Sequence, residues 1–137
     1  MREVEVSRFV RVTPAEVERA LTPAAVVEYE GSFSVVDVAD RADGSTVVTA
    51  GSRGLTLSLR FEEHEDGLYY TQEGDAGPFD AMETWVTVRP EDDGSRVTMR
   101  SAVSLGLPLS GVTDRLAAWK RRGELERALD ALATDLG

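Results

Sequence analysis

The fold class is decided by residues 55–73, LTLSLRFEEHEDGLYYTQE. In the first half of this stretch, apolar side chains at positions 55, 57, 59 and 61 alternate with polar ones, which is the period of a β-strand with one buried face. Asp66-Gly67 separates this run from a second one, and Asp-Gly between such runs is a strong β-hairpin signal because both residues tolerate a positive φ. The stretch therefore predicts two antiparallel strands, at about 55–64 and 68–73.

The same pattern continues on both sides of this hairpin. Asp43-Gly44 and Asp93-Gly94 also lie between alternating runs, and they predict further hairpin turns. The corresponding strands are expected at about 32–41, 45–52, 81–89 and 95–105. A further strand is predicted at 3–12, where alternate valines share one face. Successive hairpins of this kind form an antiparallel meander with one face in water.

Two short helices are predicted between the first strand and the meander. Thr13 can cap a helix that begins at Pro14, and Glu16, three residues after the cap, completes a capping box. A second start of the same kind stands at Thr22-Pro23, and Gly31 can end that helix. The predicted helices span about 14–21 and 23–29.

The C-terminal segment, residues 110–136, has the composition of a long helix, but its apolar residues change face. One side carries Leu109, Val112, Leu116 and Trp119, and another carries Leu125, Leu129, Leu132 and Leu136. Nine residues at about 100° each place Leu125 about half a turn from Leu116. Cations precede Gly123 and acids follow it, as at the end of one helix and the start of another. We therefore expect a kink or break within about two residues of Gly123.

The charge balance is strongly acidic. The 137 residues include 25 Asp and Glu against 15 Lys and Arg, a net charge of -10, and Lys120 is the only lysine. An acidic surface repels nucleic-acid phosphates and anionic membranes, so we expect no nucleic-acid partner and no stable membrane anchor. The acid excess with almost no lysine is typical of a salt-in halophile. A GC-rich genome alone could account for the missing lysine, and a strong net charge is also a common aid to solubility.

Several classes of site are excluded or disfavoured by composition. The chain has no cysteine, so disulfides and thiolate metal sites are excluded, and its one histidine, His64, lies in an acidic turn. We predict no metal site, no cofactor and no catalytic residue. No stretch is apolar and long enough to span a bilayer, and the N-terminus enters a strand pattern at once, so we expect a cytoplasmic protein. No repeat or linker divides residues 1–137, which predicts a single domain.

One strand, two short helices, six more strands and a last helix form an order that resembles the START-like (SRPBCC) superfamily, in particular its polyketide cyclase/dehydratase and lipid-transport branch. The resemblance rests on Thr13–Val17, on the loop 74–80 running into Met82–Trp85, and on Leu107-Pro108. It implies an α+β helix-grip fold, in which a seven-stranded curved antiparallel sheet wraps around a long C-terminal helix. It also implies an apolar cavity between the sheet and that helix, without a shared catalytic set.

The candidate ligand-binding residues are those expected on the concave face of the sheet and on the facing side of the last helix. The apolar candidates are Leu57, Leu59, Val86, Met99, Leu116 and Trp119. The polar candidates on otherwise apolar faces are Tyr70, Gln72, Thr84 and Ser101. Such polar groups either orient a ligand or bond to neighbours and buried water. Phe79 either covers the cavity mouth as part of a lid or lies in a plain hairpin connection.

Arg8 lies an even number of residues from the inward-facing valines of the first strand, so a regular strand would place it on the same face. It either projects into the cavity and anchors the anionic or carbonyl head of a ligand, or it lies in water or in an ion pair.

Three classes of function remain open. The leading hypothesis is a module that binds a small hydrophobic ligand, such as a lipid, a quinone or a polyketide-like ring. A second is a cyclase or dehydratase that uses an interior polar pair such as Arg8 with Tyr70. A third is a protein-interaction module with a collapsed cavity, which requires a large exposed apolar patch.

Overall fold

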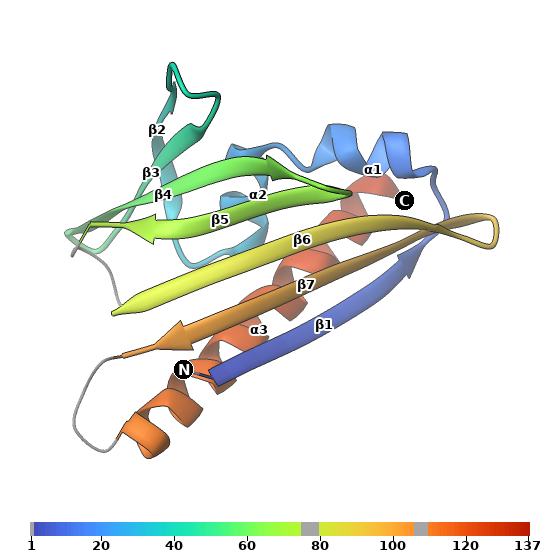
Figure 1. The fold of residues 1–137 in the computed structure, drawn as a ribbon. Helices are drawn as coiled ribbons and strands as arrows, with labels where there is room; N and C mark the ends of the chain where they lie inside the picture. Colours follow the sequence, from blue (N-terminus) through green and yellow to red (C-terminus); the bar gives the residue numbers. More distant parts are fainter. Residues whose placement is uncertain (1, 75–79, 106–109) are drawn as a thin grey trace.

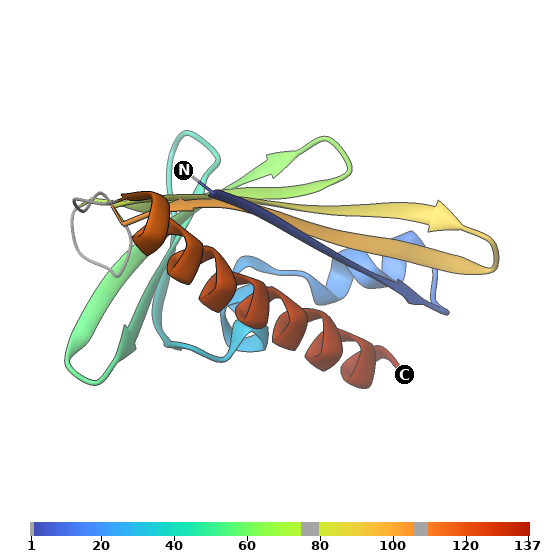
Figure 2. The same ribbon diagram turned by 90° about the horizontal axis from the view of Figure 1, so that it is seen from below.

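The computed structural model describes residues 2–74, 80–105 and 110–137. Within these residues, seven strands form one antiparallel sheet in the order β1-β7-β6-β5-β4-β3-β2, and three helices lie on its concave side (Figures 1 and 2). The strands are β1 (Arg2–Val10), β2 (Ser34–Asp40), β3 (Thr46–Ser52), β4 (Leu55–His64), β5 (Gly67–Glu73), β6 (Ala81–Glu91) and β7 (Gly94–Ser104). The helices are α1 (Pro14–Ala20), α2 (Pro23–Glu30) and α3 (Ser110–Leu136). The predicted α+β helix-grip fold, with its curved antiparallel sheet, is confirmed.

The two short helices begin and end as the capping residues predict. The Thr13 hydroxyl accepts a hydrogen bond from the Glu16 N–H (3.3 Å), and the Thr22 hydroxyl accepts one from the Ala25 N–H (3.2 Å). Each cap satisfies one of the N–H groups that the first turn of a helix leaves without an internal partner. Gly31 ends α2 with φ of 79°, a left-handed conformation that glycine adopts without steric cost.

Two of the turn glycines are required by close strand approach. A Cβ on Gly67 would lie 1.7 Å from the Val86 carbonyl oxygen, and one on Gly94 would lie 2.1 Å from the Val10 carbonyl oxygen. Neither space can hold a methyl group, because both neighbours are backbone atoms of a paired strand. The Asp-Gly signals at these positions thus reflect tight packing of the sheet as well as turn geometry.

Helix α3 runs unbroken from Ser110 to Leu136, so the predicted break at Gly123 is wrong. The helix packs against β1, β7 and α2 (Figure 2). One continuous face of it is buried, namely Asp114, Ala117, Ala118, Arg121, Glu124, Leu125, Ala128, Leu129 and Leu132. These positions recur every three or four residues, as one helix face requires. The apparent change of face arises because the buried positions before Gly123 are small or polar, whereas large apolar residues there are exposed.

The concave face of the sheet has a packed centre and an open end. In the centre, Tyr70, Thr84, Val86, Met99 and Ser101 are almost completely buried, so these side chains do not line the apolar cavity that was expected between the sheet and the last helix. At the open end, Val38 and Leu55 face the same side as their buried neighbours but are 47% and 39% exposed. Apolar side chains on an inner face normally lose most of their exposure to packing, so the open end is a part of that face that residues 2–74, 80–105 and 110–137 leave uncovered.

Candidate functional site

The centre of the concave face contains a buried arginine, Arg121 of α3, which is only 2% exposed. Its Nε donates to Ser101 Oγ (3.0 Å), Nη1 donates to Glu30 Oε1 (2.5 Å) and Glu124 Oε1 (3.3 Å), and Nη2 donates to the Tyr70 hydroxyl (2.6 Å) and Thr84 Oγ1 (2.9 Å). A guanidinium has five N–H groups, so every donor of Arg121 has a protein acceptor. We call these six side chains the Arg121 network.

The network joins elements that are distant in the sequence. Glu30 is the last residue of α2, immediately before the glycine that ends the helix. Glu124 lies three residues after Arg121, so the two share one face of α3. Tyr70, Thr84 and Ser101 come from neighbouring positions on three adjacent strands, as the strand register shows.

Further contacts hold the partners of Arg121 in place. The Tyr70 hydroxyl donates to the Glu30 carboxylate, and its ring stacks on Phe61 with the centroids 4.4 Å apart. The hydroxyls of Thr84 and Ser101 lie 2.8 Å apart. The Ser32 hydroxyl donates to Glu124. Each polar atom is therefore oriented by a neighbour as well as by the guanidinium, which fixes the geometry of the network.

Burial and charge act in opposite directions on the pKa values of the network. Burial alone would lower the pKa of Arg121, but the carboxylates of Glu30 and Glu124 outweigh it, so the pKa is raised above its usual range. Burial raises the pKa of Tyr70 well above its ordinary value, because Arg121 offsets only part of the effect. The pKa of Glu124 is lowered: burial would raise it, and the Arg121 charge, the Ser32 hydroxyl and Lys120 together prevail. At neutral pH the network holds a charged guanidinium and a protonated tyrosine.

This arrangement suits an internal anchor better than a reaction centre. Arg121 has no N–H group left for a substrate, and Tyr70 remains protonated and cannot act as a base. A buried charge is tolerated only where its partners are complete, which is the state observed here. Within the described part of the chain, no three His, Cys, Asp or Glu side chains are grouped so that they could hold a metal ion.

The structure brings three of the predicted polar residues, Tyr70, Thr84 and Ser101, into this one network. The apolar candidates Leu57, Leu59, Val86 and Met99 face the interior and are buried. Gln72 is half-buried on the same face, paired in register with Leu59. Phe79 lies outside the described residues, as do Leu107-Pro108 and Leu109.

Two predicted placements, those of Leu116 and Trp119, require correction, and the structure decides between the two alternatives for Arg8. Leu116 and Trp119 were expected to face the sheet, but they are 62% and 77% exposed, because small and polar residues occupy the inward face of this half of α3. Arg8 does not project into a cavity. It lies on an edge strand, and its Nη1 bonds to the exposed carboxylate of Asp130 on α3. An exposed ion pair of this kind leaves the arginine in water and contributes little to stability.

The sequence prediction missed Arg121, Glu30 and Glu124. The helical spacing contains a signal for Arg121. Positions 132, 128, 125 and 121 are three or four residues apart and therefore lie on one face of the helix. The run of cations around Arg121 resembles a helix end, and this resemblance hides the continuation of the buried face through it.

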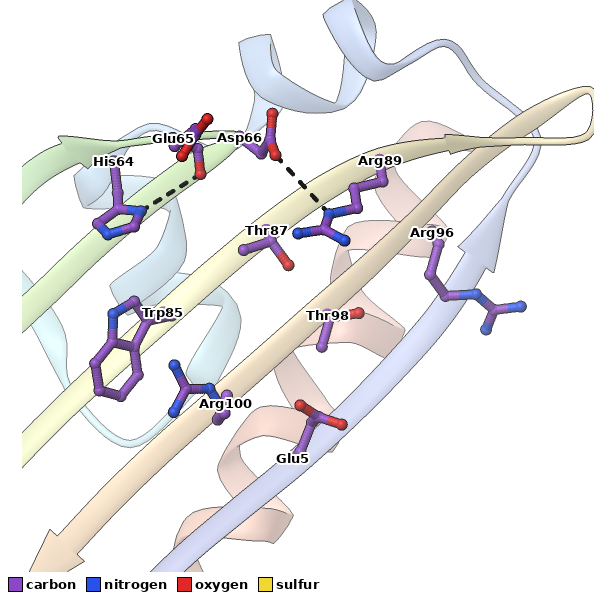
Figure 3. Close-up of a pocket in the computed structure, with 10 residues that line it drawn as sticks. All are labelled: Glu5, His64, Glu65, Asp66, Trp85, Thr87, Arg89, Arg96, Thr98 and Arg100. Carbon is purple, nitrogen blue, oxygen red and sulfur yellow. Dashed lines mark hydrogen bonds and ion pairs between the residues drawn. The ribbon is translucent and has the colours of Figure 1, made fainter.

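A second polar site lies on the outer face of the sheet. A hollow of about 640 Å³ is lined by residues of β1, β4, β6 and β7 and of the β4–β5 turn, among them His64, Trp85 and Arg100 (Figure 3). The Arg100 guanidinium lies 3.9 Å from the centroid of the Trp85 ring, a cation–π geometry. The arginines around this hollow are already engaged: Arg89 with Asp66, Arg96 with Glu91 and Arg100 with Glu3. Each of these arginines thus has a carboxylate beside it, although exposed pairs of this kind contribute little to stability.

Another hollow, of about 430 Å³, lies between the two short helices and the β4–β5 turn. Its floor includes Leu21, Val86 and Val88, which are already almost completely buried. Its rim carries Glu18, Glu63 and Asp66. The floor therefore offers little apolar surface to a ligand.

A curved antiparallel sheet that holds a long C-terminal helix places the chain among helix-grip proteins. The chain belongs to the family described as "Polyketide cyclase / dehydrase and lipid transport", whose model matches residues 1–137. A search of curated proteins finds no significant match.

Solved structures share the fold at low sequence identity. A protein from Thermus thermophilus has a TM-score of 0.74 and 20% identity, with 97% of this chain and 95% of that chain covered. A START superfamily protein from Mycobacterium smegmatis has a TM-score of 0.72 and 13% identity, with 97% and 95% covered. The di-domain ARO/CYC protein BexL has a TM-score of 0.67 and 23% identity, with 93% of this chain and 45% of that chain covered.

Proposed function

We propose that the protein binds a small apolar or amphipathic molecule, of the lipid, quinone or polyketide-like class, at the open end of its concave face. The observation that carries the proposal is the exposure of Val38 and Leu55 on a face whose other apolar side chains are buried or partly buried. An uncovered apolar surface inside a curved sheet is where an apolar ligand gains most from leaving water. Membership of a family described by polyketide cyclisation and lipid transport supports this class of ligand.

The strand register defines what such a ligand would contact. Val38, Val48, Leu59 and Gln72 form one row across the concave face, through successive strand pairs. Along β4, Leu55 is exposed, whereas Leu57, like Val48 and Leu59, is almost completely buried. The surface open to a ligand therefore consists of Val38, Leu55 and the half-buried Gln72. Gln72 is the polar side chain of this row, and an amide can orient the polar end of an amphipathic ligand. The row lies beside that of Tyr70, Thr84 and Ser101, so the Arg121 network closes the inner wall of the proposed site.

The structure does not support the enzymatic alternative that pairs Arg8 with Tyr70. Arg8 bonds to Asp130 at the edge of the sheet, whereas the Tyr70 hydroxyl is held within the buried network. A general acid and base must both reach the same substrate, which these two positions do not allow.

A matched pair of substitutions tests the proposed site. Val38 and Val36 lie on the same edge strand, but Val36 sits at a β-bulge and packs beside Gly51 on the opposite face. We expect Val38→Asp to weaken the binding of a neutral naphthylamine fluorophore about tenfold or more, because a carboxylate replaces apolar contact surface. Val36→Asp should leave the affinity within about twofold of the unmodified protein.

Native mass spectrometry of the purified protein provides an independent readout. A co-purified small molecule that is retained by Val36→Asp and lost from Val38→Asp would support the site and identify the ligand. Equal loss of fluorophore binding in both variants, or no binding by the unmodified protein, would refute the proposal.

We also infer that the acidic surface adapts the protein to high salt. The net charge of -10 on 137 residues makes the compact state repel itself until salt screens the repulsion. The thermal midpoint should therefore rise between dilute buffer and molar KCl. An unchanged midpoint would contradict the inference.

A further inference from the structure

The outward side of the first half of α3 carries an exposed apolar stripe. Val112 and Leu116 are each 62% exposed, and Trp119 is 77% exposed. At about 100° per residue the three lie within about 60° of one another and point away from the buried face of the helix. The first turns of α3 also project beyond the N-terminal end of β1 at one end of the molecule (Figure 1). The stripe is therefore accessible to a large flat partner.

Cations flank this stripe on both sides. Arg115 and Arg122 lie on one side of it and Lys120 on the other, and all three are exposed. The only acidic residue between positions 112 and 123 is Asp114, which is buried on the inward face and accepts a hydrogen bond from the Leu105 N–H (3.0 Å). The surface of this half-helix is thus positive, on a chain whose net charge is -10.

Two of these cations make local contacts that leave them at the surface. Lys120 Nζ lies 3.4 Å from the carboxylate of Glu124, and Arg122 donates to the Glu5 carbonyl oxygen at 3.4 Å. Both distances are long, and the Lys120 side chain remains 57% exposed. Long, flexible cationic side chains of this kind can reorient toward an external anion.

We propose that the first half of α3 docks on the surface of an anionic lipid membrane. Tryptophan and leucine on one side of a helix, with Lys and Arg beside them, is the pattern of helices that lie in the membrane interface. No helix in the described residues is long and apolar enough to cross a membrane, so the contact is peripheral. Acids more than about 8 Å from the lipid are largely screened at physiological ionic strength, and Glu124, the acid beside Lys120, is itself buried.

A second copy of the chain is a poorer occupant of this stripe. The segment from Val112 to Trp119 is about 12 Å long, at about 1.5 Å per residue. A stable protein interface buries about 800 Å² on each partner, which is far more than three side chains supply. A two-fold contact centred on the stripe would also bring the three cations of one copy against those of the other. Anionic lipid complements both the apolar and the positive parts of the surface.

Vesicle flotation tests the proposal with the intact chain. The vesicles contain either phosphatidylcholine alone or phosphatidylcholine with one third phosphatidylglycerol, at the lowest KCl concentration at which circular dichroism shows the native fold. The protein should float only with the anionic vesicles. Replacement of Arg115, Lys120 and Arg122 by Gln should reduce the partition coefficient by roughly fivefold per cation. The emission of Trp119, measured in a Trp85→Phe background, should shift to shorter wavelength on binding.

A matched pair of valines controls for general surface hydrophobicity. Val112 and Val36 have nearly equal exposure, 62% and 67%, but Val36 is on the edge strand β2. Val112→Ser combined with Leu116→Ser and Trp119→Ser should reduce binding tenfold or more, whereas Val36→Ser should not change it. The proposal does not depend on the ligand site, since Val38→Asp should float like the unmodified protein.

Three results would overturn the proposal. The first is equal partitioning of the triple-serine variant and the unmodified protein. The second is failure of the unmodified protein to float with anionic vesicles. The third is a dimer, detected by sedimentation equilibrium, that Trp119→Ser converts to monomer while vesicles are never bound; the stripe would then be covered by a second copy.

Discussion

Along α3, the half before Gly123 and the half after it bury opposite kinds of side chain. The second half buries Leu125, Leu129 and Leu132 and exposes charged residues such as Glu126 and Asp130. The first half instead buries the guanidinium of Arg121 together with the carboxylate of Asp114, and it exposes Leu116 and Trp119. Both halves belong to one unbroken helix with one continuous inward face.

This difference shows that a helix can keep one inward face along its whole length although the kind of side chain on that face changes. The helix keeps its geometry because the inward positions recur at the same spacing throughout. What differs is how each half is held against the rest of the protein. The second half is held by buried leucines, and the first half by the hydrogen bonds around the Arg121 guanidinium. The two mechanisms predict different responses to substitution.

The largest effect is expected for Arg121→Met. Removal of the guanidinium leaves Glu30 and Glu124 buried without their counter-charge, and the free energy of unfolding should fall by about 3–5 kcal/mol. Chemical denaturation measures the loss. Arg122→Met, at the adjacent exposed position, should change stability by less than about 0.5 kcal/mol.

A triple variant sharpens the interpretation of that result. If Glu30 and Glu124 are also replaced by Met, much of the lost stability should return, because no uncompensated charge remains in the interior. A loss below about 1 kcal/mol for Arg121→Met would show that the network is not what attaches the first half of the helix.

For the second half of the helix we expect ordinary core behaviour. Leu132→Ala removes a side chain that is 1% exposed and should lower the free energy of unfolding by about 2–4 kcal/mol through lost burial and a residual cavity. Unlike Arg121→Met, this loss should be nearly independent of pH between 5 and 8. A strong pH dependence would mean that the two halves are coupled through the same charges.

A moderate effect is expected from acid. The pKa of Glu124 is lowered in the folded protein, chiefly because the Arg121 charge outweighs the effect of burial. A carboxylate with a lowered pKa stabilises the fold above its unfolded pKa, near 4.3, and that contribution is lost as pH falls through the folded value. Denaturation between pH 6 and pH 3 should therefore show declining stability. Glu124→Gln, itself less stable by about 1–3 kcal/mol at pH 7, should show a smaller decline.

The smallest effect is expected for Trp119→Ser. Because this side chain is 77% exposed, its loss should change the free energy of unfolding by no more than about 0.5 kcal/mol. Thermal denaturation in the absence of lipid provides the measurement. A loss comparable with that of Leu132→Ala would indicate that the stripe is covered in solution.

The sequence predicted the sheet and the short helices because their signals are local. Alternation in β4, the two Thr-Pro caps and the Asp-Gly turns each depend on a few adjacent residues. The placement of Tyr70, Thr84 and Ser101 on the inner face also followed from alternation. What their hydroxyls contact depends on Arg121, which is between 20 and 51 residues away in the chain.

The prediction for α3 failed for a physical reason. Amphipathicity arguments assume that apolar side chains mark the buried face, and before Gly123 that assumption is reversed. The same assumption placed Leu116 and Trp119 toward the sheet. The alternation of side chains placed Arg8 on the inward face of β1. Alternation alone does not show whether an edge strand is covered, and the partner of Arg8, Asp130, is 122 residues away.

The Arg121 network also makes the stability of one half of α3 depend on distant parts of the chain. Apart from Glu124 on α3 itself, its acceptors lie on α2, β5, β6 and β7, and Glu30 is 91 residues from the arginine. The guanidinium leaves water at acceptable cost only when these acceptors are already in place, because an unpaired buried charge is strongly unfavourable. The leucines after Gly123 need no such prior assembly to leave water. The half of α3 that carries Arg121 is therefore stable against the sheet only where the meander and α2 are in place, whereas the leucine-bearing half does not depend on them in this way.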